Sequence, residues 1–366
     1  MKILVAMSGG VDSSVAAHLL KTKGHELTGA MMKFFSDDDL PPVKNTDRAC
    51  CTLSDADDAR AVANAMNIPF YVFNFAENFA ETVMERFVRS YQNGTTPNPC
   101  IDCNRFLKFE KFIHRAAELE CDKIATGHYA RISQDANGRF LLKKGADTTK
   151  DQSYVLYAMT QTQLSRTVFP LGELKKEEVR AIAEAQLFVN AQKRDSQDIC
   201  FAPDGDYAGF IERRTGSPQK KGRFIDRSGN ILGEHKGIVH YTIGQRKGLG
   251  ISAPEPLFVV ALNSDENTIT LGSDDDLFAK KLIARDINFI PFDTLNGSLR
   301  VSAKIRYAHK PQPATVFQTA ADEILCEFDR PQRAITPGQA IVFYDAYDGE
   351  TIIGGATIAA QASSLK

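Results

Sequence analysis

Residues 1–75 alternate between short apolar runs and stretches in which apolar residues recur every three or four positions. Short apolar runs are typical of buried strands, and the wider spacing is typical of amphipathic helices. The pattern predicts strands at residues 2–7, 27–34 and 70–75, and helices at residues 12–23 and 54–66. A strand–helix–strand–helix–strand order predicts a parallel sheet covered by helices, which is an α/β fold.

Helical periodicity continues beyond this region and then gives way to strand patterns. We expect further helices at residues 79–91, 106–119 and 175–187, and a short strand at residues 123–126. Turn-forming residues separate short runs of β-forming residues after about residue 203. This later part is expected to form hairpins at 226–232 and 262–272 and strands at 299–307, 314–319, 324–328, 340–344 and 351–358.

The change of pattern predicts three domains. We place an α/β domain at residues 1–203, a small β-rich central domain at 204–279 and a C-terminal β-barrel-like domain at 280–366. A length of 366 residues fits two or three domains. The order of the strands and the closure of a barrel do not follow from the pattern.

Composition and charge narrow the class of protein. Hydrophobic residues make up 43% and charged residues 25% of the chain, as in ordinary globular proteins. No apolar run approaches the roughly 18 residues of a membrane span, so we expect a cytoplasmic protein with no membrane partner. The net charge of −2 gives no general attraction to nucleic acid. A polyanionic partner would therefore be held by local basic patches.

The segment AMSGGVDSS, residues 6–14, follows the first predicted strand and carries the features of a phosphate-binding loop. Gly9 and Gly10 permit a tight turn that points successive N–H groups at one anion. The next helix adds the positive end of its dipole. A Walker P-loop is excluded, because the chain has no Gly-Lys pair. The candidate nucleotide loop consists of Ala6, Met7, Ser8, Gly9, Gly10, Val11, Asp12 and Ser13.

Asp12 in this loop points to a cation. Its carboxylate would repel phosphate unless a cation lay between them, so a Mg²⁺ ion bound by Asp12 is expected. The plainer alternative for the whole segment is an ordinary strand-to-helix turn in which Ser or Asp caps the helix.

The cysteine content points to thiol chemistry and not to a disulfide framework. The chain has seven cysteines, an odd number, and no secretory signal. Cys100 and Cys103 form the one C-x-x-C pair. Polar neighbours surround Cys103 and Cys200, which argues against ordinary apolar burial of these two thiols. We assign packing, or no role, to the remaining cysteines, Cys50, Cys51, Cys121 and Cys326.

The loop resembles the PP-loop of the ATP pyrophosphatase superfamily, whose members cleave ATP between the α and β phosphates. Six further segments sit at distances similar to those in one branch of that superfamily, the tRNA-specific 2-thiouridylases. They are NGTTPNPCIDCNRFLKF (93–109), ATGHYAR (125–131), KDQSYVLY (150–157), DSQDICF (195–201), HKGIVHYTIGQRKGLG (235–250) and KIRYAHKP (304–311).

The resemblance implies an ATP-dependent reaction on tRNA. ATP would adenylate the C2 oxygen of the wobble uridine, position 34, and sulfur from a cysteine persulfide would replace that oxygen. The products would be 2-thiouridine, AMP and pyrophosphate. Cys103 would be the nucleophile and Cys200 the persulfide carrier, so that a disulfide forms between them. An upstream persulfide donor protein would supply the sulfur. Met32 would lie against adenine and Gly127 against the nucleotide.

The resemblance also implies contacts with the anticodon region of tRNA. Asn98 would lie near the target base. The remaining residues implied as tRNA contacts are His128, Lys150, Asp151, Gln152, Arg306, Tyr307 and Gln339. A further candidate comes from charge alone, because residues 206–227 hold six Lys or Arg against three Asp or Glu. The alternative for this stretch is a solvated charged face.

Three other hypotheses remain open at this stage. A PP-loop synthetase that forms an amide or C–N bond would not need Cys103 and Cys200. A non-catalytic zinc or iron–sulfur RNA-binding module would use Cys100 and Cys103 and would not consume ATP. In a variant of the thiolation, Cys100, Cys103 and Cys200 would hold an iron–sulfur cluster. The last hypothesis arises because Cys100 stands where many similar proteins have Asp. We favour the redox pair of Cys103 and Cys200.

Overall fold

The structure of the chain is a computed structural model that describes residues 1–35, 53–195 and 199–362. The chain forms two compact units, each assembled from segments that are separate in the sequence. The first unit comprises Met1–Met84, Pro99–Asp204 and Glu350–Ile352, and the second comprises Glu85–Asn98, Gly205–Gly349 and Ile353–Lys366. The division into three domains at residues 203 and 279 stays a prediction.

The first unit is built on a parallel sheet with the order β3-β2-β1-β4-β7 among the described residues. β1 is the central strand, and its apolar residues Ile3, Leu4 and Val5 are fully buried. The predicted parallel sheet is therefore confirmed. The strands are β1 (Lys2–Ala6), β2 (Glu26–Lys33), β3 (Phe70–Asn74), β4 (Lys123–Ala125) and β7 (Thr167–Val168).

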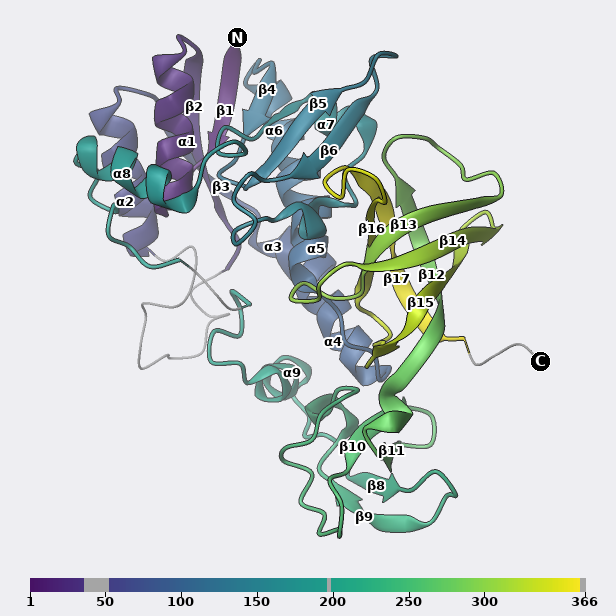
Figure 1. The fold of residues 1–366 in the computed structure, drawn as a ribbon. Helices are drawn as coiled ribbons and strands as arrows, with labels where there is room; N and C mark the ends of the chain where they lie inside the picture. The colour runs from purple at the N-terminus through teal and green to yellow at the C-terminus, as the bar shows by residue number, and fades with distance from the viewer. Residues whose placement is uncertain (36–52, 196–198, 363–366) are drawn as a thin grey trace. The chain divides into compact units, whose positions relative to one another are not determined.

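Three amphipathic helices pack on one face of this sheet. α1 (Val11–Thr22), α2 (Leu53–Ala65) and α8 (Lys176–Ala185) share one apolar core with β1 and β2. Figure 1 shows the three helices on the same side of the sheet. The other helical segments of this unit are α3 (Ala76–Phe79), η2 (Ala80–Met84), α5 (Pro99–Asp102), η3 (Cys103–Lys111), α6 (Phe112–Glu118), η4 (Ser153–Leu156) and α7 (Gln161–Ser165).

Two of the differences from the sequence prediction lie between residues 76 and 144. The helix expected at 79–91 begins earlier and contains the π-helical stretch η2, which is followed by α4 (Glu85–Gln92). An antiparallel hairpin of β5 (Ala130–Gln134) and β6 (Phe140–Lys144) was not predicted. Its strands are only partly buried and lack a clear apolar alternation, so the period-2 signal was weak.

The second unit holds a small sheet and a closed barrel among its described residues. The small sheet has the order β10-β11-β8-β9, and its two predicted hairpins, β8–β9 and β10–β11, are confirmed. Helix α9 (Tyr207–Thr215) precedes this sheet. The strands and short helices of this part are β8 (Gly222–Ile225), β9 (Ile231–His235), η5 (Ile238–His240), β10 (Phe258–Asn263), β11 (Thr268–Gly272) and η6 (Asp275–Leu277).

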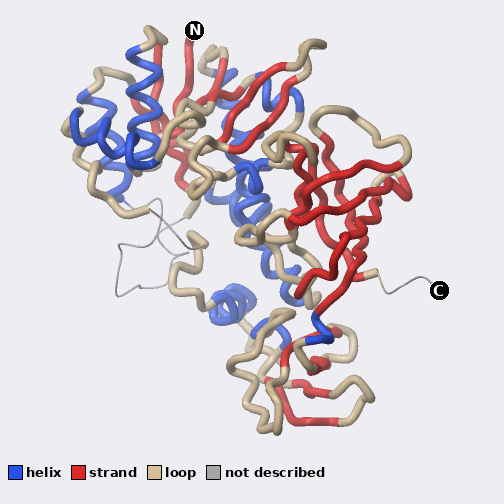
Figure 2. Tube along the Cα trace, in the orientation of Figure 1, coloured by secondary structure: helices blue, strands red, loops and turns tan. Residues whose placement is uncertain are grey.

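The barrel closes in the order β12-β15-β14-β13-β16-β17, and its interior is apolar. Alternate residues of β15, such as Ile324, Cys326 and Phe328, are fully buried. Figure 2 shows strands dominating this part of the chain, whereas the first unit mixes helices and strands. The expected barrel is confirmed. Its strands are β12 (Phe278–Phe289), β13 (Ser298–Lys304), β14 (Gln312–Ala320), β15 (Glu323–Arg333), β16 (Ala340–Asp345) and β17 (Ile352–Gln361).

No helix within the described ranges is long and apolar enough to cross a membrane.

Candidate active site

The loop after β1 lies where the strand order of the sheet reverses, because β1 pairs with β2 on one side and with β4 on the other. Ligands of open parallel sheets bind beyond the carboxyl ends of the strands at such a point. The N-cap residue of α1, Gly10, has an extended backbone and makes no side-chain cap hydrogen bond. The first N–H groups of α1 are therefore left for an anionic ligand.

Two glycines allow the backbone to approach this loop closely. Gly9 has a φ of +73°, and a Cβ atom there would lie 2.3 Å from the carbonyl oxygen of Asp55 in α2. Gly127 follows β4, and a Cβ atom there would lie 2.8 Å from the backbone nitrogen of Ser13. The structure thus brings Gly127 against the first turn of α1, so two segments predicted separately for the nucleotide site lie together.

Serine hydroxyls brace the loop from inside. Ser13 Oγ accepts a hydrogen bond from the Ser8 N–H at 3.2 Å and donates one to the carbonyl oxygen of Gly10 at 2.9 Å. Ser14 Oγ also donates to the Gly10 oxygen, at 3.2 Å. Ser13 and Ser14 are buried and Ser8 is exposed. These contacts hold the turn in shape.

Asn190 is a site residue that the sequence analysis missed. It follows α8 and is 2% exposed. Its Nδ2 donates to the carbonyl oxygen of Gly9 and to Ser14 Oγ, both at 2.9 Å. Its Oδ1 has no hydrogen-bond partner among the described residues. No local motif marked Asn190, because it lies 181 positions from Gly9.

A charged cluster surrounds the side chain of Asp12. The Tyr129 hydroxyl donates to Asp12 Oδ1 at 2.8 Å, and Lys176 Nζ lies 2.7 Å from Oδ1 and 2.8 Å from Oδ2. Lys176 Nζ also lies 2.7 Å from Oδ1 of Asp195.

Asp195 in turn pairs with Lys150 at 2.8 Å and with Arg180 at 3.2 Å. The cluster links α1, α8 and the segment that leads toward Cys200.

The environment of the cluster fixes its protonation. Burial raises the pKa of Tyr129, and the negative charge of Asp12 raises it further, so Tyr129 keeps the proton that it donates. Partial burial opposes ionisation of Asp195, but hydrogen bonds from Lys150 and Lys176 outweigh burial and lower the pKa of this carboxyl. Asp195 is therefore ionised at neutral pH.

The position of Lys176 in its helix is a sequence feature that could have indicated carboxylates nearby. A lysine in the first turn of a helix is disfavoured, because the positive end of the helix dipole lies there. Lys176 is the first residue of α8 and is only 8% exposed. A buried cation at that position needs carboxylates nearby, and the structure supplies them.

Met32 lies near the end of β2, directly opposite Phe73 of β3. Its side chain is 7% exposed and belongs to the packing of the sheet. The contact with adenine that the resemblance implies would therefore fall to the Met32 backbone. The contact itself stays a prediction.

The cysteine pair C-x-x-C spans the junction of two helical segments. Cys100 lies in α5 and is exposed, whereas Cys103 is the first residue of the π-helix η3 and is 8% exposed. The neighbouring Asn104 is 3% exposed, and its Nδ2 donates to the carbonyl oxygen of Val155 at 3.2 Å. This bond ties η3 to η4 and fixes the backbone that carries Cys103.

Cys200 is half-buried in a turn of the same unit. Its neighbour Phe201 is fully buried, with its ring 5.8 Å from that of Phe79, which also packs on Phe34 beyond β2. The polar residues Ser196–Asp198, which argued for a polar setting of Cys200, lie outside the described residues, as do Cys50 and Cys51. Cys121 and Cys326 are buried, in agreement with packing roles.

Four of the predicted tRNA contacts lie in the first unit, and all four contact other residues of that unit, Lys150 through its ion pair with Asp195 at 2.8 Å. His128 is 8% exposed and its Nδ1 lies 2.7 Å from Thr126 Oγ1. Burial lowers the pKa of His128 well below its ordinary value, with Lys108 adding to the effect, so the ring is neutral. Asp151 accepts from the N–H and hydroxyl of Ser153, at 3.1 and 2.9 Å. Gln152 Oε1 accepts from the Tyr129 N–H at 3.0 Å.

The other predicted tRNA contacts lie in the second unit. Arg306 donates to the carbonyl oxygen of Arg333 at 3.2 Å. Tyr307 is 46% exposed, with Lys304 Nζ 5.2 Å from its ring centre. Gln339 Nε2 donates to the carbonyl oxygens of Thr96 at 2.8 Å and Pro97 at 3.3 Å, and so holds the chain just before Asn98.

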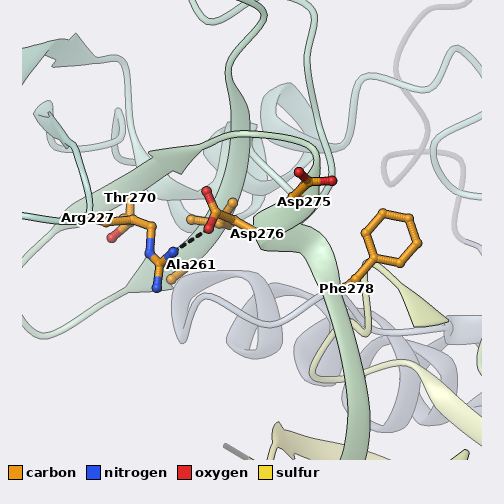
Figure 3. Close-up of a pocket in the computed structure, with 7 residues that line it drawn as sticks. Arg227, Ala261, Thr270, Asp275, Asp276 and Phe278 are labelled. Atoms are coloured by element: carbon orange, nitrogen blue, oxygen red, sulfur yellow. Dashed lines mark hydrogen bonds and ion pairs between the residues drawn. The ribbon is translucent and has the colours of Figure 1, made fainter. Parts of the chain in front are cut away.

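Two further observations bear on ligands. Within residues 1–35, 53–195 and 199–362, no group of three or more His, Cys, Asp or Glu side chains is placed to hold a metal ion. A cavity of ≈ 510 Å³ lies in the second unit and is shown in Figure 3. None of the predicted nucleotide-loop residues, cysteines or individually named tRNA contacts lines this cavity, whereas Arg227 of the basic stretch 206–227 does. Its lining residues are Arg227, Val260, Ala261, Thr270, Asp275, Asp276 and Phe278.

Comparison with protein families gives three consecutive matches. Residues 1–204 match the tRNA methyl transferase HUP domain, residues 208–273 the tRNA methyl transferase PRC-barrel domain, and residues 279–358 the aminomethyltransferase beta-barrel domain.

Curated relatives match over nearly the whole chain. A protein of Lachnoclostridium phytofermentans named tRNA-specific 2-thiouridylase MnmA is 51% identical over 98% of this chain and 99% of its own length. A protein of Clostridioides difficile with the same name is 50% identical over 98% of both chains.

Proposed function

The chain belongs to the tRNA-specific 2-thiouridylase family, and from that premise we propose that it replaces O2 of the wobble uridine of tRNA with sulfur in an ATP-dependent reaction. The observation that carries the proposal is the uncapped first turn of α1, bordered by Gly9 and Gly127. A helix end of this kind suits a pyrophosphate group, since its N–H groups and dipole favour negative charge.

The role of ATP in this proposal is to create a leaving group. The C2 oxygen of uridine is a poor leaving group until it carries AMP. The loop Ala6–Ser13 would hold the departing pyrophosphate, and the backbones of Met32 and Gly127 would hold the adenosine half. The lack of a P-loop lysine fits this role, because the γ-phosphate is not the group transferred.

Cys103 and Cys200 would then deliver the sulfur. Before this step, an upstream persulfide donor protein transfers a sulfur atom to Cys200, which then carries a persulfide. The Cys103 thiolate attacks Sγ of Cys200, so the S–S bond of the persulfide breaks and a Cys103–Cys200 disulfide forms. The released sulfide attacks the adenylated C2 carbon, and AMP leaves with the former O2. A dithiol reductant returns both cysteines to thiols for the next turnover.

Two inorganic groups, Mg²⁺ and an iron–sulfur cluster, could take part in this reaction. A Mg²⁺ ion on Asp12 fits poorly while Tyr129 and Lys176 occupy that carboxylate, so no step is routed through it. Mg²⁺ enters the proposal with the phosphates of ATP. An iron–sulfur cluster on Cys100, Cys103 and Cys200 remains the second hypothesis. The redox pair is preferred because Cys100 and Cys103 differ in exposure, with only Cys103 buried beside the anchored Asn104.

The partners follow from the same proposal. tRNA is the substrate, with Asn98 near the target base. Further contacts come from Lys150, Arg306, Tyr307 and Gln339, and His128, Asp151 and Gln152 shape the surface that tRNA meets. We also propose that the division at residues 203 and 279 separates catalytic, central and barrel domains, and that the protein acts in the cytoplasm, where tRNA resides.

One assay tests the whole proposal. The protein is incubated with unmodified tRNA, ATP, Mg²⁺ and a sulfide source, and the digested nucleosides are analysed by mass. We expect 2-thiouridine together with equal amounts of AMP and pyrophosphate. Stoichiometric ADP and phosphate, or a product with a new C–N bond, would contradict the proposal. Binding of tRNA without ATP consumption would favour a non-catalytic metal module.

A further inference from the structure

Lys176 holds an unusual position at the proposed phosphate site. It enters from α8, and its ammonium group meets both carboxylate oxygens of Asp12, at 2.7 and 2.8 Å. Asp12 is the second residue of α1, so this ammonium lies beside the helix end that would bind pyrophosphate. The side chain of Lys176 is 10% exposed, which removes most competition from water.

Asp195 and Asp12, the two carboxylates that Lys176 contacts, each have a further partner. Asp195 keeps Lys150 at 2.8 Å and Arg180 at 3.2 Å when Lys176 moves away. Asp12 keeps the hydrogen bond from the Tyr129 hydroxyl. An ammonium group has three donors on a flexible stem and can exchange one carboxylate oxygen for a phosphate oxygen with little movement.

A pyrophosphate group also requires a cation here. It brings several negative charges to a loop that has no lysine or arginine of its own between residues 6 and 14. The end of a helix supplies only about half an elementary charge. Asp12 adds a negative charge at the same place, which must be offset before phosphate can approach.

We propose that Lys176 is a pyrophosphate-binding residue, and that Asp12 positions its ammonium group beside the first turn of α1. The inference rests on the proposed use of ATP. In Walker sites a lysine within the loop binds the phosphates. Here Lys176 would bind them instead, from α8, which is far from the loop in sequence.

The test measures binding alone, without tRNA or sulfur. Pyrophosphate and ATP are titrated into the full chain by calorimetry, for the wild type, Lys176→Met and the matched control Lys175→Met. Lys175 is the exposed neighbour, so the control removes the same charge from the same helix. We expect Lys176→Met to weaken pyrophosphate binding by about tenfold or more, because a hydrogen bond to a charged group is lost. Lys175→Met should bind like the wild type.

Equal pyrophosphate affinity in Lys176→Met and wild type would overturn the proposal and leave Lys176 as a structural ion pair. If Lys176→Met does not fold, the pyrophosphate affinity of Asp195→Asn is an independent test. This substitution frees Lys176 from one carboxylate, so pyrophosphate should bind as tightly as in the wild type or a few-fold more tightly. A loss of affinity in Asp195→Asn would contradict the proposal. Failure of thiolation in a wild type that binds pyrophosphate would instead contradict the proposed function.

Discussion

Asn190 Nδ2 donates to the carbonyl oxygen of Gly9 at 2.9 Å, across 181 positions of sequence. The bond holds the carbonyl of a residue whose φ of +73° only glycine adopts readily. A second bond from the same Nδ2 reaches Ser14 Oγ, one turn into α1. One buried amide therefore fixes both the loop and the helix that follows it.

Replacing this amide should weaken nucleotide binding. In Asn190→Ala the Gly9 oxygen and the Ser14 hydroxyl lose a buried donor, which costs about 1–3 kcal/mol. We expect a lower thermal midpoint and a weaker affinity for ATP in a direct titration. Asn137→Ala, at an exposed turn of the same unit, serves as the control and should change neither. Unaltered ATP affinity in Asn190→Ala would show that the loop keeps its shape without the amide.

The two proposed cysteines should be equally indispensable. Cys103→Ala and Cys200→Ala each remove one sulfur of the redox pair, so 2-thiouridine should fall below detection by nucleoside mass analysis. Cys100→Ser is the matched control and should retain a measurable fraction, because Cys100 is exposed and lies outside the pair. Protein purified without oxygen that holds stoichiometric iron and sulfide, and loses both in all three variants, would establish the cluster instead.

The local pattern of apolar, polar and turn-forming residues was sufficient to predict much of the fold. The apolar run of β1, the Gly-Gly loop and the start of α1 are adjacent in sequence, so their order predicted the strand, the tight turn and the helix directly. Asp226 and Asn230 close the predicted turn between β8 and β9 through a backbone bond of 2.9 Å. Each of these features depends on residues a few positions apart.

The missed features depend on distant residues or interrupted patterns. β12 carries a positive φ at Asp286 and register shifts against β17, which disturb its alternation. Lys176 meets Asp12 across 164 positions, so no local pattern in the sequence could reveal this contact. Barrel closure is likewise a property of strand pairing between distant segments, and no local signal encodes it.

Binding of tRNA should depend strongly on salt, despite the net charge of −2. Lys220, Lys221 and Arg223 are all exposed before or within β8. Each phosphate that such residues neutralise should steepen the log–log dependence of affinity on salt by about 0.7–0.9. Reversing the three to Glu should weaken binding and flatten the slope. Reversal of the exposed Lys21 and Lys23 of the first unit serves as the control, and equal effects from both sets would reduce the patch to a solvated surface.

Asp276 should make the stability of the second unit depend on pH. Its carboxylate accepts from the Ser273 N–H at 2.8 Å and Ser273 Oγ at 2.9 Å, and pairs with Arg227 across the cavity in Figure 3. The Ser273 N–H, followed by the Ser273 hydroxyl and the charge of Arg227, lowers the pKa of Asp276 against the opposing effect of burial. A carboxyl with a lowered folded pKa stabilises the protein above its unfolded pKa, near pH 4. This contribution disappears as the pH falls through the lower, folded value.

Asp276→Asn should therefore be less stable than the wild type at pH 7, by on the order of 1 kcal/mol. The difference should shrink as the pH falls below about 4, because the wild-type carboxyl then takes up a proton. Urea unfolding at pH 7 and at pH 3 measures both values. Asp275→Asn makes the same charge change at an exposed neighbour and should leave the urea midpoint close to that of the wild type. A deficit in Asp276→Asn that is equal at both pH values would mean that the variant loses packing and not an ionised acceptor.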